Sequence, residues 1–130
     1  MKQVIEAIVR EFRGSVLAAE TTGIWGSLAP ENTARPYVTW DYISNAPEQN
    51  SDSFEERPLL QFSIWTANDT PDEAYKLFGL LRQIYDNAIF DVDAVHLVSM
   101  VRDADRCVRD PDGGWQYSAD YRLFVERMKT

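Results

Sequence analysis

The sequence is poor in the residues that cross-link or drive catalysis in many small proteins, with one cysteine and one histidine among 130 residues. A single thiol cannot form an intramolecular disulfide, which is typical of proteins from a reducing compartment. The chain also has no G-x-S-x-G motif and no glycine-rich phosphate-binding motif. A reactive Cys107–His96 pair stays open, but a core or edge histidine is the simpler interpretation, and we expect no enzyme activity.

Basic residues are scarce as well, since 13 Lys and Arg stand against 21 Asp and Glu, a formal net charge of −8. Phosphate contacts dominate the affinity for nucleic acid, so a protein that grips DNA is not expected. An acidic surface past which DNA slides without sticking is compatible with this charge. No run of about 18 apolar residues occurs, so no membrane span is expected. Glu6, Arg10 and Glu11 interrupt the apolar stretch that a signal peptide would need.

Apolar and aromatic residues are plentiful, at 45% and 12% of the chain, so a hydrophobic core is available. A chain of this length fits one domain, residues 1–130, which needs neither disulfides nor a metal to fold. The turn at residues 110–114, DPDGG, lacks the acid spacing and closing glutamate of an EF-hand loop. We therefore expect no metal site and no cofactor.

Two stretches carry apolar residues at helical spacing, residues 3–12 and residues 71–86. Their apolar positions are Val4, Ile5, Ile8, Val9 and Phe12 in the first and Ala74, Leu77, Phe78, Leu81, Ile84 and Tyr85 in the second. The sequence Thr-Pro-Asp-Glu precedes the second stretch and predicts that Thr70 caps the helix, with Pro71 at its first position.

Four stretches alternate apolar and polar residues, as strands do. They are residues 37–44, residues 58–66, residues 95–102 running on to the turn at Asp110, and the stretch that follows Gly114. Consecutive strands most simply pair as hairpins. The prediction is an α+β fold with the order α-β-β-α-β-β, a mostly antiparallel four-stranded sheet of two hairpins, and two main helices packed on one face.

Two groups of charged residues are candidates for a subunit or partner interface. The polar segment 45–57 between the first two strands is long for a connection and carries Glu48, Asp52, Glu55 and Glu56. Arg102, Arg106 and Arg109 form a basic group in an otherwise acidic chain. The two groups are complementary in charge, and between copies such a contact would repeat around a ring.

Leu59 and Trp65 are candidates for an apolar contact. They fall on the strand face opposite Leu60, Phe62 and Ile64. Apolar residues on the outer face of a sheet indicate either a second covering layer or another subunit.

The order of these features resembles a family of phage proteins. The segments that carry the likeness are "LAPENTARPYVTW", "LLQFSIWT" and "RDPDGGWQYSADYRLFVE", with a helix between the last two. Over about residues 24–126 the chain resembles the tail-completion proteins of long-tailed phages, also called tail-terminator or tail-to-head joining proteins. None of these segments is catalytic, so the resemblance implies no active-site residues.

The resemblance implies a virion subunit, made in the host cytoplasm, that assembles as a ring of typically six copies. The ring caps the head-proximal end of the tail tube, contacts the tube protein and a neck or stopper protein, and lets DNA pass without specific binding. Two alternatives stay open. One is another neck component, such as a head-completion or stopper protein. The other is a small host-side binding module or an unrecognised enzyme.

Overall fold

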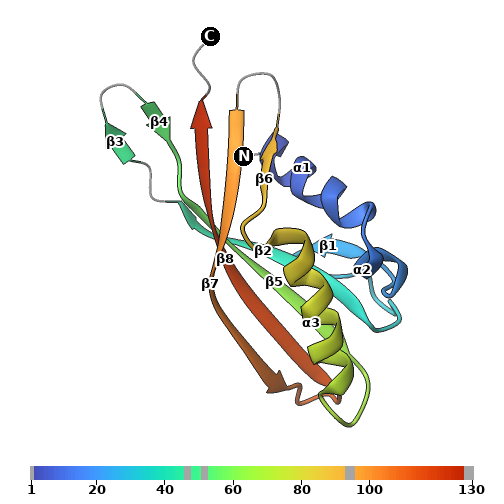
Figure 1. Cartoon of the computed structure of the whole chain (residues 1–130). Helices are drawn as coiled ribbons and strands as arrows, with labels where there is room; N and C mark the ends of the chain where they lie inside the picture. Colours follow the sequence, from blue (N-terminus) through green and yellow to red (C-terminus); the bar gives the residue numbers. More distant parts are fainter. Residues whose placement is uncertain (1, 46–47, 51–52, 93–95, 128–130) are drawn as a thin grey trace.

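The computed structural model describes residues 2–45, 48–50, 53–92 and 96–127 (Figure 1). Its elements are α1 (Lys2–Arg13), α2 (Val16–Ala19), β1 (Ile24–Gly26), β2 (Tyr37–Asn45), β3 (Glu48–Asn50), β4 (Ser53–Glu55), β5 (Pro58–Thr66), α3 (Asp72–Tyr85), β6 (Ile89–Asp91), β7 (His96–Arg109) and β8 (Trp115–Arg127).

The main sheet has six strands in the order β1-β2-β5-β8-β7-β6 and curls into a half-barrel (Figure 1). β1 pairs parallel with β2, and every other neighbour in the sheet is antiparallel. β3 and β4 form a separate two-stranded hairpin.

The predicted α+β fold with a four-stranded antiparallel sheet and two main helices is therefore wrong, because the protein is mostly β with a mixed six-stranded sheet. The four long strands that alternation predicts are present as β2, β5, β7 and β8. The added strands β1 and β6 have three residues each, which is too short for a period of two to stand out. β1 is defined by its pairing with the start of β2, and β6 by its pairing with the start of β7.

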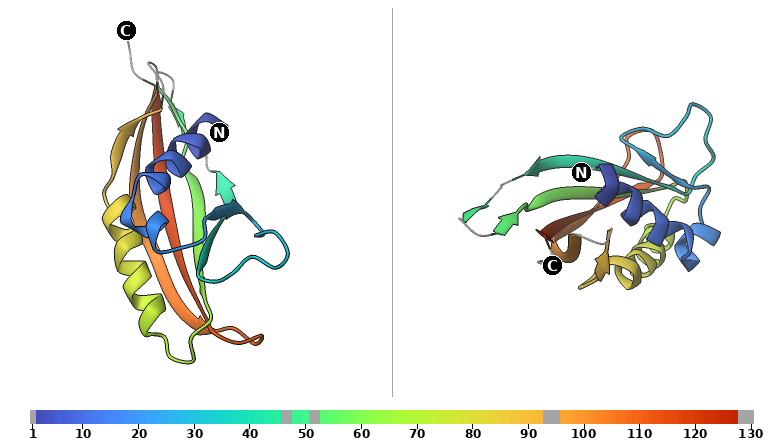
Figure 2. Two further views of the ribbon diagram at one scale, coloured as in Figure 1. Left: turned by 90° about the vertical axis from the view of Figure 1, so that its right-hand side faces the viewer. Right: turned by 90° about the horizontal axis from the view of Figure 1, so that it is seen from above.

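Helices α1 and α3 lie on one side of the sheet in both views of Figure 2. The inner face of β8 shows why the sheet accepts them. Tyr117, Ala119, Tyr121 and Leu123 all point to the helices and are buried. Burial of such apolar side chains is the main force that holds a helix against a sheet.

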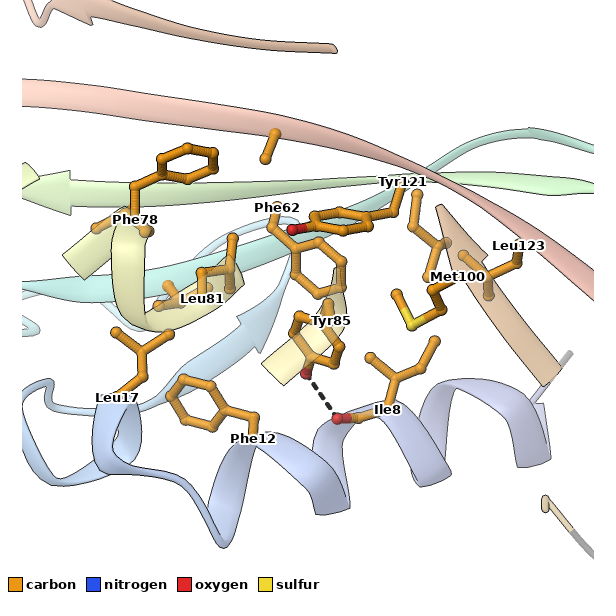
Figure 3. Packing of buried hydrophobic residues seen from close by; sticks show 14 of the residues in the cluster. Ile8, Phe12, Leu17, Phe62, Phe78, Leu81, Tyr85, Met100, Tyr121 and Leu123 are labelled. Carbon is orange, nitrogen blue, oxygen red and sulfur yellow. Dashed lines mark hydrogen bonds between the residues drawn. The ribbon is translucent and has the colours of Figure 1, made fainter. Parts of the chain in front are cut away.

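Large aromatic and aliphatic side chains from the helices and the sheet fill the core (Figure 3). Phe62 on β5 lies opposite Ala119 on β8, and the small alanine leaves room for rings from the helix layer. The Tyr85 ring stacks on Phe62 with centroids 4.8 Å apart. Its hydroxyl donates to the Ile8 carbonyl of α1 over 2.7 Å, which ties the two helices together. Burial raises the pKa of Tyr85 well above its ordinary value, so the hydroxyl keeps its proton.

The prediction that Thr70 caps α3 is wrong. The helix begins at Asp72, its N-cap residue is Pro71, and no side-chain hydrogen bond caps it. Thr70 therefore lies one position before the cap, where its hydroxyl no longer meets the free N–H groups of the first turn. Asp72 and Glu73 still lie in that turn, where their charges favour the positive end of the helix dipole.

Candidate assembly surface

The sheet face opposite the helices carries rows of small polar side chains. Thr39, Ser63 and Ser118, on three adjacent strands, are each only 2% exposed. The hydroxyls of Ser63 and Ser118 lie 3.2 Å apart, and the Gln116 side-chain amide donates to both over 3.2 Å. These bonds satisfy polar groups that neighbouring side chains shield from water.

The next row along the same face is charged. The Gln61 amide donates to Asp120 over 2.9 Å, and the Arg106 guanidinium lies 3.8 Å from the other carboxylate oxygen of Asp120. The Arg106 side chain is 53% exposed, so it remains accessible to a partner. The outer face of the sheet is thus polar in its middle, with Arg106 at the border.

Trp65 lies on this outer face and is covered from within the molecule. Its ring stacks on Tyr37 with centroids 6.3 Å apart, and the Arg35 guanidinium lies 5.6 Å from the ring centre. Its indole N–H donates to the Thr39 hydroxyl over 3.0 Å. Leu59 lies nearer the other end of β5, half-buried beside Ser44.

Arg35 holds the end of β5 to the turn between β7 and β8. Its guanidinium donates to the Thr66 carbonyl over 3.0 Å, to the Gly113 carbonyl over 2.9 Å and to the Asp110 carboxylate over 2.7 Å. Hydrogen bonds to the carboxylate from the Asp112 N–H and from Arg35 hold the pKa of Asp110 below its ordinary value. The role of Arg35 was missed from the sequence, although the "RPYV" segment is part of the family resemblance.

The three candidate arginines do not share one face of the sheet. Arg102 lies opposite Tyr121 on the helix side, whereas Arg106 lies opposite Ser118 on the outer side. A β-bulge between Arg102 and Ala104 shifts the alternation by one residue. Arg109 is exposed and faces the helix side again.

Arg102 is engaged within the molecule. Its guanidinium lies 2.9 Å from Asp105, 3.5 Å from Asp86 and 5.4 Å from the centre of the Phe78 ring. Asp86 also accepts a 2.6 Å hydrogen bond from the Tyr121 hydroxyl. This network joins the end of α3 to β7 and β8, so Arg106 and Arg109 are the more accessible of the three arginines.

The acidic residues lie at the far end of the sheet from Arg106 and Arg109. Glu48 and Glu55 are register partners in the β3–β4 hairpin, which extends beyond the main sheet (Figure 1). Asp52 falls outside the described residues. Glu56 joins the hairpin to β8 through two backbone hydrogen bonds with Val125, of 3.3 and 2.9 Å.

Val125 and Ser118, the partner of Arg106, are separated by about 23 Å along β8 at the usual rise of a strand. The acidic and basic groups therefore do not meet within one copy. Their role in an interface between copies stays a prediction.

Cys107 and His96 also lie far apart. Both are on β7, near its two ends, and a strand of that length separates them by roughly 35 Å. This distance rules out a Cys–His pair within one copy. Burial raises the pKa of the Cys107 thiol, which lowers the fraction of reactive thiolate.

Within the described ranges, no group of three or more His, Cys, Asp or Glu side chains is placed to hold a metal ion. No helix in that part of the chain is long and apolar enough to cross a membrane.

Comparison with known proteins supports a virion origin. No curated protein matches the sequence. A chain in a solved structure titled "Virion of native gene transfer agent (GTA) particle" has the same fold, with a TM-score of 0.81 and 17% sequence identity over 92% of this chain and 91% of that one. The family described as "Tail completion protein gp17" matches residues 6–126. The chain therefore belongs to this tail completion family and is a structural protein of a phage-type virion, located in the tail.

Proposed function

We propose that the protein closes the head-proximal end of the tail tube as a ring of six copies of a single tail-terminator domain, and that this ring joins the tail to the neck of the capsid. The observation that carries this proposal is the family match, which spans residues 6–126 and so nearly the whole fold. Completion of a tail requires a part that caps the tube and accepts the head. The protein acts through its surfaces and catalyses no reaction.

The net negative charge of the chain supports the proposal that DNA passes through the ring without binding to it. A net charge of −8 disfavours tight contact with phosphates, so DNA that passes the ring is not held. A closed ring also needs two different complementary patches on each copy, because its contacts are heterologous.

The charged groups supply candidate patches. In the proposed ring, the acidic segment 45–57, which carries Glu48, Asp52, Glu55 and Glu56, meets the basic residues of the neighbouring copy. Those residues are Arg102, Arg106 and Arg109, of which Arg106 and Arg109 are exposed. Exposed ion pairs contribute little affinity but set register and reject wrong partners. Leu59 and Trp65 add apolar area to the contact.

The test is assembly of the purified protein on tail tubes from the same virion, imaged by electron microscopy. We expect a ring at one end of each tube, and deletion of the gene should leave filled heads and tubes that do not join. A head-completion or stopper protein would instead remain on filled heads and leave tube ends bare. That distribution would contradict the proposed role.

A further inference from the structure

The β7 strand has a long free edge. β6 pairs only with Leu97–Ser99 of β7, and the Met100 N–H donates to the Ala88 carbonyl over 2.9 Å. In the part of the chain that the structure describes, no strand lies beside residues 101–109 on that side. Val101 and Val108 on this stretch are 45% and 46% exposed.

The β2 strand has a second free edge, on the opposite side of the same sheet. β1 pairs only with Val38, Thr39 and Trp40, and no described strand continues beside residues 41–45. Tyr42 and Ile43 are 45% and 50% exposed. This stretch has no Lys or Pro, two residues that commonly protect a sheet edge from pairing, and its register with β5 shifts by one residue between Tyr42 and Ser44.

Backbone hydrogen bonds show which residues direct their N–H and C=O groups outward from β2. The Val38 N–H donates to the Gly23 carbonyl over 3.0 Å, and the Trp40 carbonyl accepts from the Ser27 N–H over 2.8 Å. With a period of two, Tyr42 directs its backbone groups to the same side, beyond the end of β1.

The same argument applies to β7. Met100 directs its N–H outward, toward Ala88. The bulge between Arg102 and Ala104 adds one residue, so the outward positions beyond it are Asp105, Cys107 and Arg109. Their side chains lie on the helix side of the sheet, as does that of Tyr42, whose partner Leu60 is in the core.

We propose that the free edge of β7 in one copy pairs antiparallel with the free edge of β2 in the next copy, so that the sheet continues around the ring. The inference rests on the proposed ring. β2, β5, β8 and β7 alternate in direction, so copies that share one orientation bring β7 and β2 together antiparallel. Outward residues then face outward residues with side chains on the same face, as an antiparallel pair requires.

The short strand β1 sets the register. Gly26 is the register partner of Trp40, and Ser27 bonds to the Trp40 carbonyl, so that edge position is already occupied. β7 of the neighbouring copy ends at Arg109, and it avoids β1 when Arg109 lies opposite Tyr42. A shift that places Cys107 opposite Tyr42 would bring Arg109 against Trp40, where β1 already pairs.

A second copy fits these edges better than a foreign strand. Each copy carries both edges on opposite sides of one sheet, so a ring satisfies all of them at once. A two-fold dimer that pairs β7 with β7 would leave both β2 edges open.

The test is disulfide cross-linking on assembled tail tubes. In a Cys107→Ser background, Tyr42→Cys and Arg109→Cys are combined in one chain, assembled on tubes and oxidised. We expect a ladder of covalent oligomers that ends at the size of the ring. Each single-cysteine variant should give no ladder. A matched control, Asp41→Cys with Arg109→Cys, should also lose the ladder, because the Asp41 side chain lies on the other face.

A second pair keeps the test independent of one variant's folding. The register shift between Tyr42 and Ser44 adds one residue to β2, so the next outward position after Tyr42 is Asn45, and Asn45→Cys should cross-link to the native Cys107 of the neighbour. The strand pairing would be overturned if rings form on tubes but none of these cross-links appears, and if Tyr42→Cys combined with Asp105→Cys also gives no cross-link. That outcome would leave the proposed function intact. Failure of the unmodified protein to form rings on tubes would overturn both.

Discussion

The Arg35 side chain joins parts of the chain that are far apart in sequence. It contacts the end of β5, the turn between β7 and β8, and the Trp65 ring. Its side chain is 22% exposed, and Asp110, its charged partner, is 8% exposed. Loss of the guanidinium would remove a donor from the Thr66 and Gly113 carbonyls and from the Asp110 carboxylate, which would keep its bond from the Asp112 N–H.

Arg35→Ala should therefore lower the free energy of unfolding by about 1.5–3 kcal/mol, the usual range for hydrogen bonds to a charged group. Arg35→Lys should recover only part of the loss, because an ammonium group cannot reproduce the planar fork that reaches several acceptors. Urea unfolding of the three proteins measures the difference. Equal midpoints for Arg35→Ala and the parent would show that the contacts do not stabilise the fold.

Asp110 should make stability depend on pH in the acid range. Its folded-state pKa is lowered, so its contribution is fully present above the ordinary pKa of an aspartate, about 3.9. The contribution is lost as the pH falls through the lower pKa of the folded protein. Asp110→Asn should flatten this part of the curve of unfolding free energy against pH. Asp112→Asn, an exposed neighbour in the same turn, is the control and should keep the slope.

At the scale of elements, the turn between β7 and β8 depends on close backbone contact. Gly113 and Gly114 both have positive φ, of 104° and 81°. A Cβ on Gly114 would collide with the Thr66 carbonyl, whereas a Cβ on Gly113 would meet nothing within 4 Å. The two glycines therefore share backbone strain but differ in available space.

Gly113→Ala should lower the free energy of unfolding by about 1–2 kcal/mol, because only the left-handed backbone penalises the new side chain. Gly114→Ala should cost clearly more, since overpacking adds about 1–3 kcal/mol and the neighbour is backbone that cannot rotate away. Thermal or urea unfolding of the pair gives the comparison. Similar losses for both variants would contradict the steric argument.

At the start of α3, substitution of Thr70 should have little effect on the free energy of unfolding. Thr70 makes no capping bond in this structure, because Pro71 occupies the cap position. Thr70→Ala should therefore change the free energy of unfolding by no more than about 0.5 kcal/mol, as for a surface substitution. A true cap would lose about 0.5–2 kcal/mol, and a urea midpoint shifted that far would restore Thr70 as the cap.

At the scale of the whole molecule, charge distribution should influence assembly. Glu56, at the base of the β3–β4 hairpin, lies at one end of the sheet, and the exposed Arg106 and Arg109 lie at the other. These acidic and basic groups can therefore meet only between copies. Reversal of Arg106 and Arg109 to Glu should leave the monomer folded but impair ring formation on tubes.

Adding Glu55→Lys and Glu56→Lys to that variant should restore part of the assembly, most visibly at low salt, where screening is weakest. Sedimentation of tubes with bound protein measures it. Normal assembly of the reversed variant at low salt would show that charge matching does not guide the ring. Unfolding of each variant in urea serves as the control, because Arg106 also lies near Asp120 within one copy.

Some of the site was within reach of sequence reasoning and some was not. The polar and acidic stretch, the arginines and the outer position of Trp65 follow from residue type and alternation. The bulge that separates Arg102 from Arg106 leaves no local mark in the sequence, since a single extra residue in a strand resembles irregular alternation. The cover of Arg35 over Trp65 depends on a loop that has no period of its own.

The sequence by itself determined the approximate positions of the four long strands and of the amphipathic stretches that form α1 and α3, because periods of two and of 3.6 residues are properties of nearby residues. Only the tertiary structure decided the six-stranded order, the parallel pairing of β1, the clamp at Arg35 and the two free edges. These features arise between segments far apart in the chain. They form because one arrangement of strands buries the apolar side chains and pairs the backbone N–H and C=O groups of the whole molecule. No local sequence pattern encodes that arrangement.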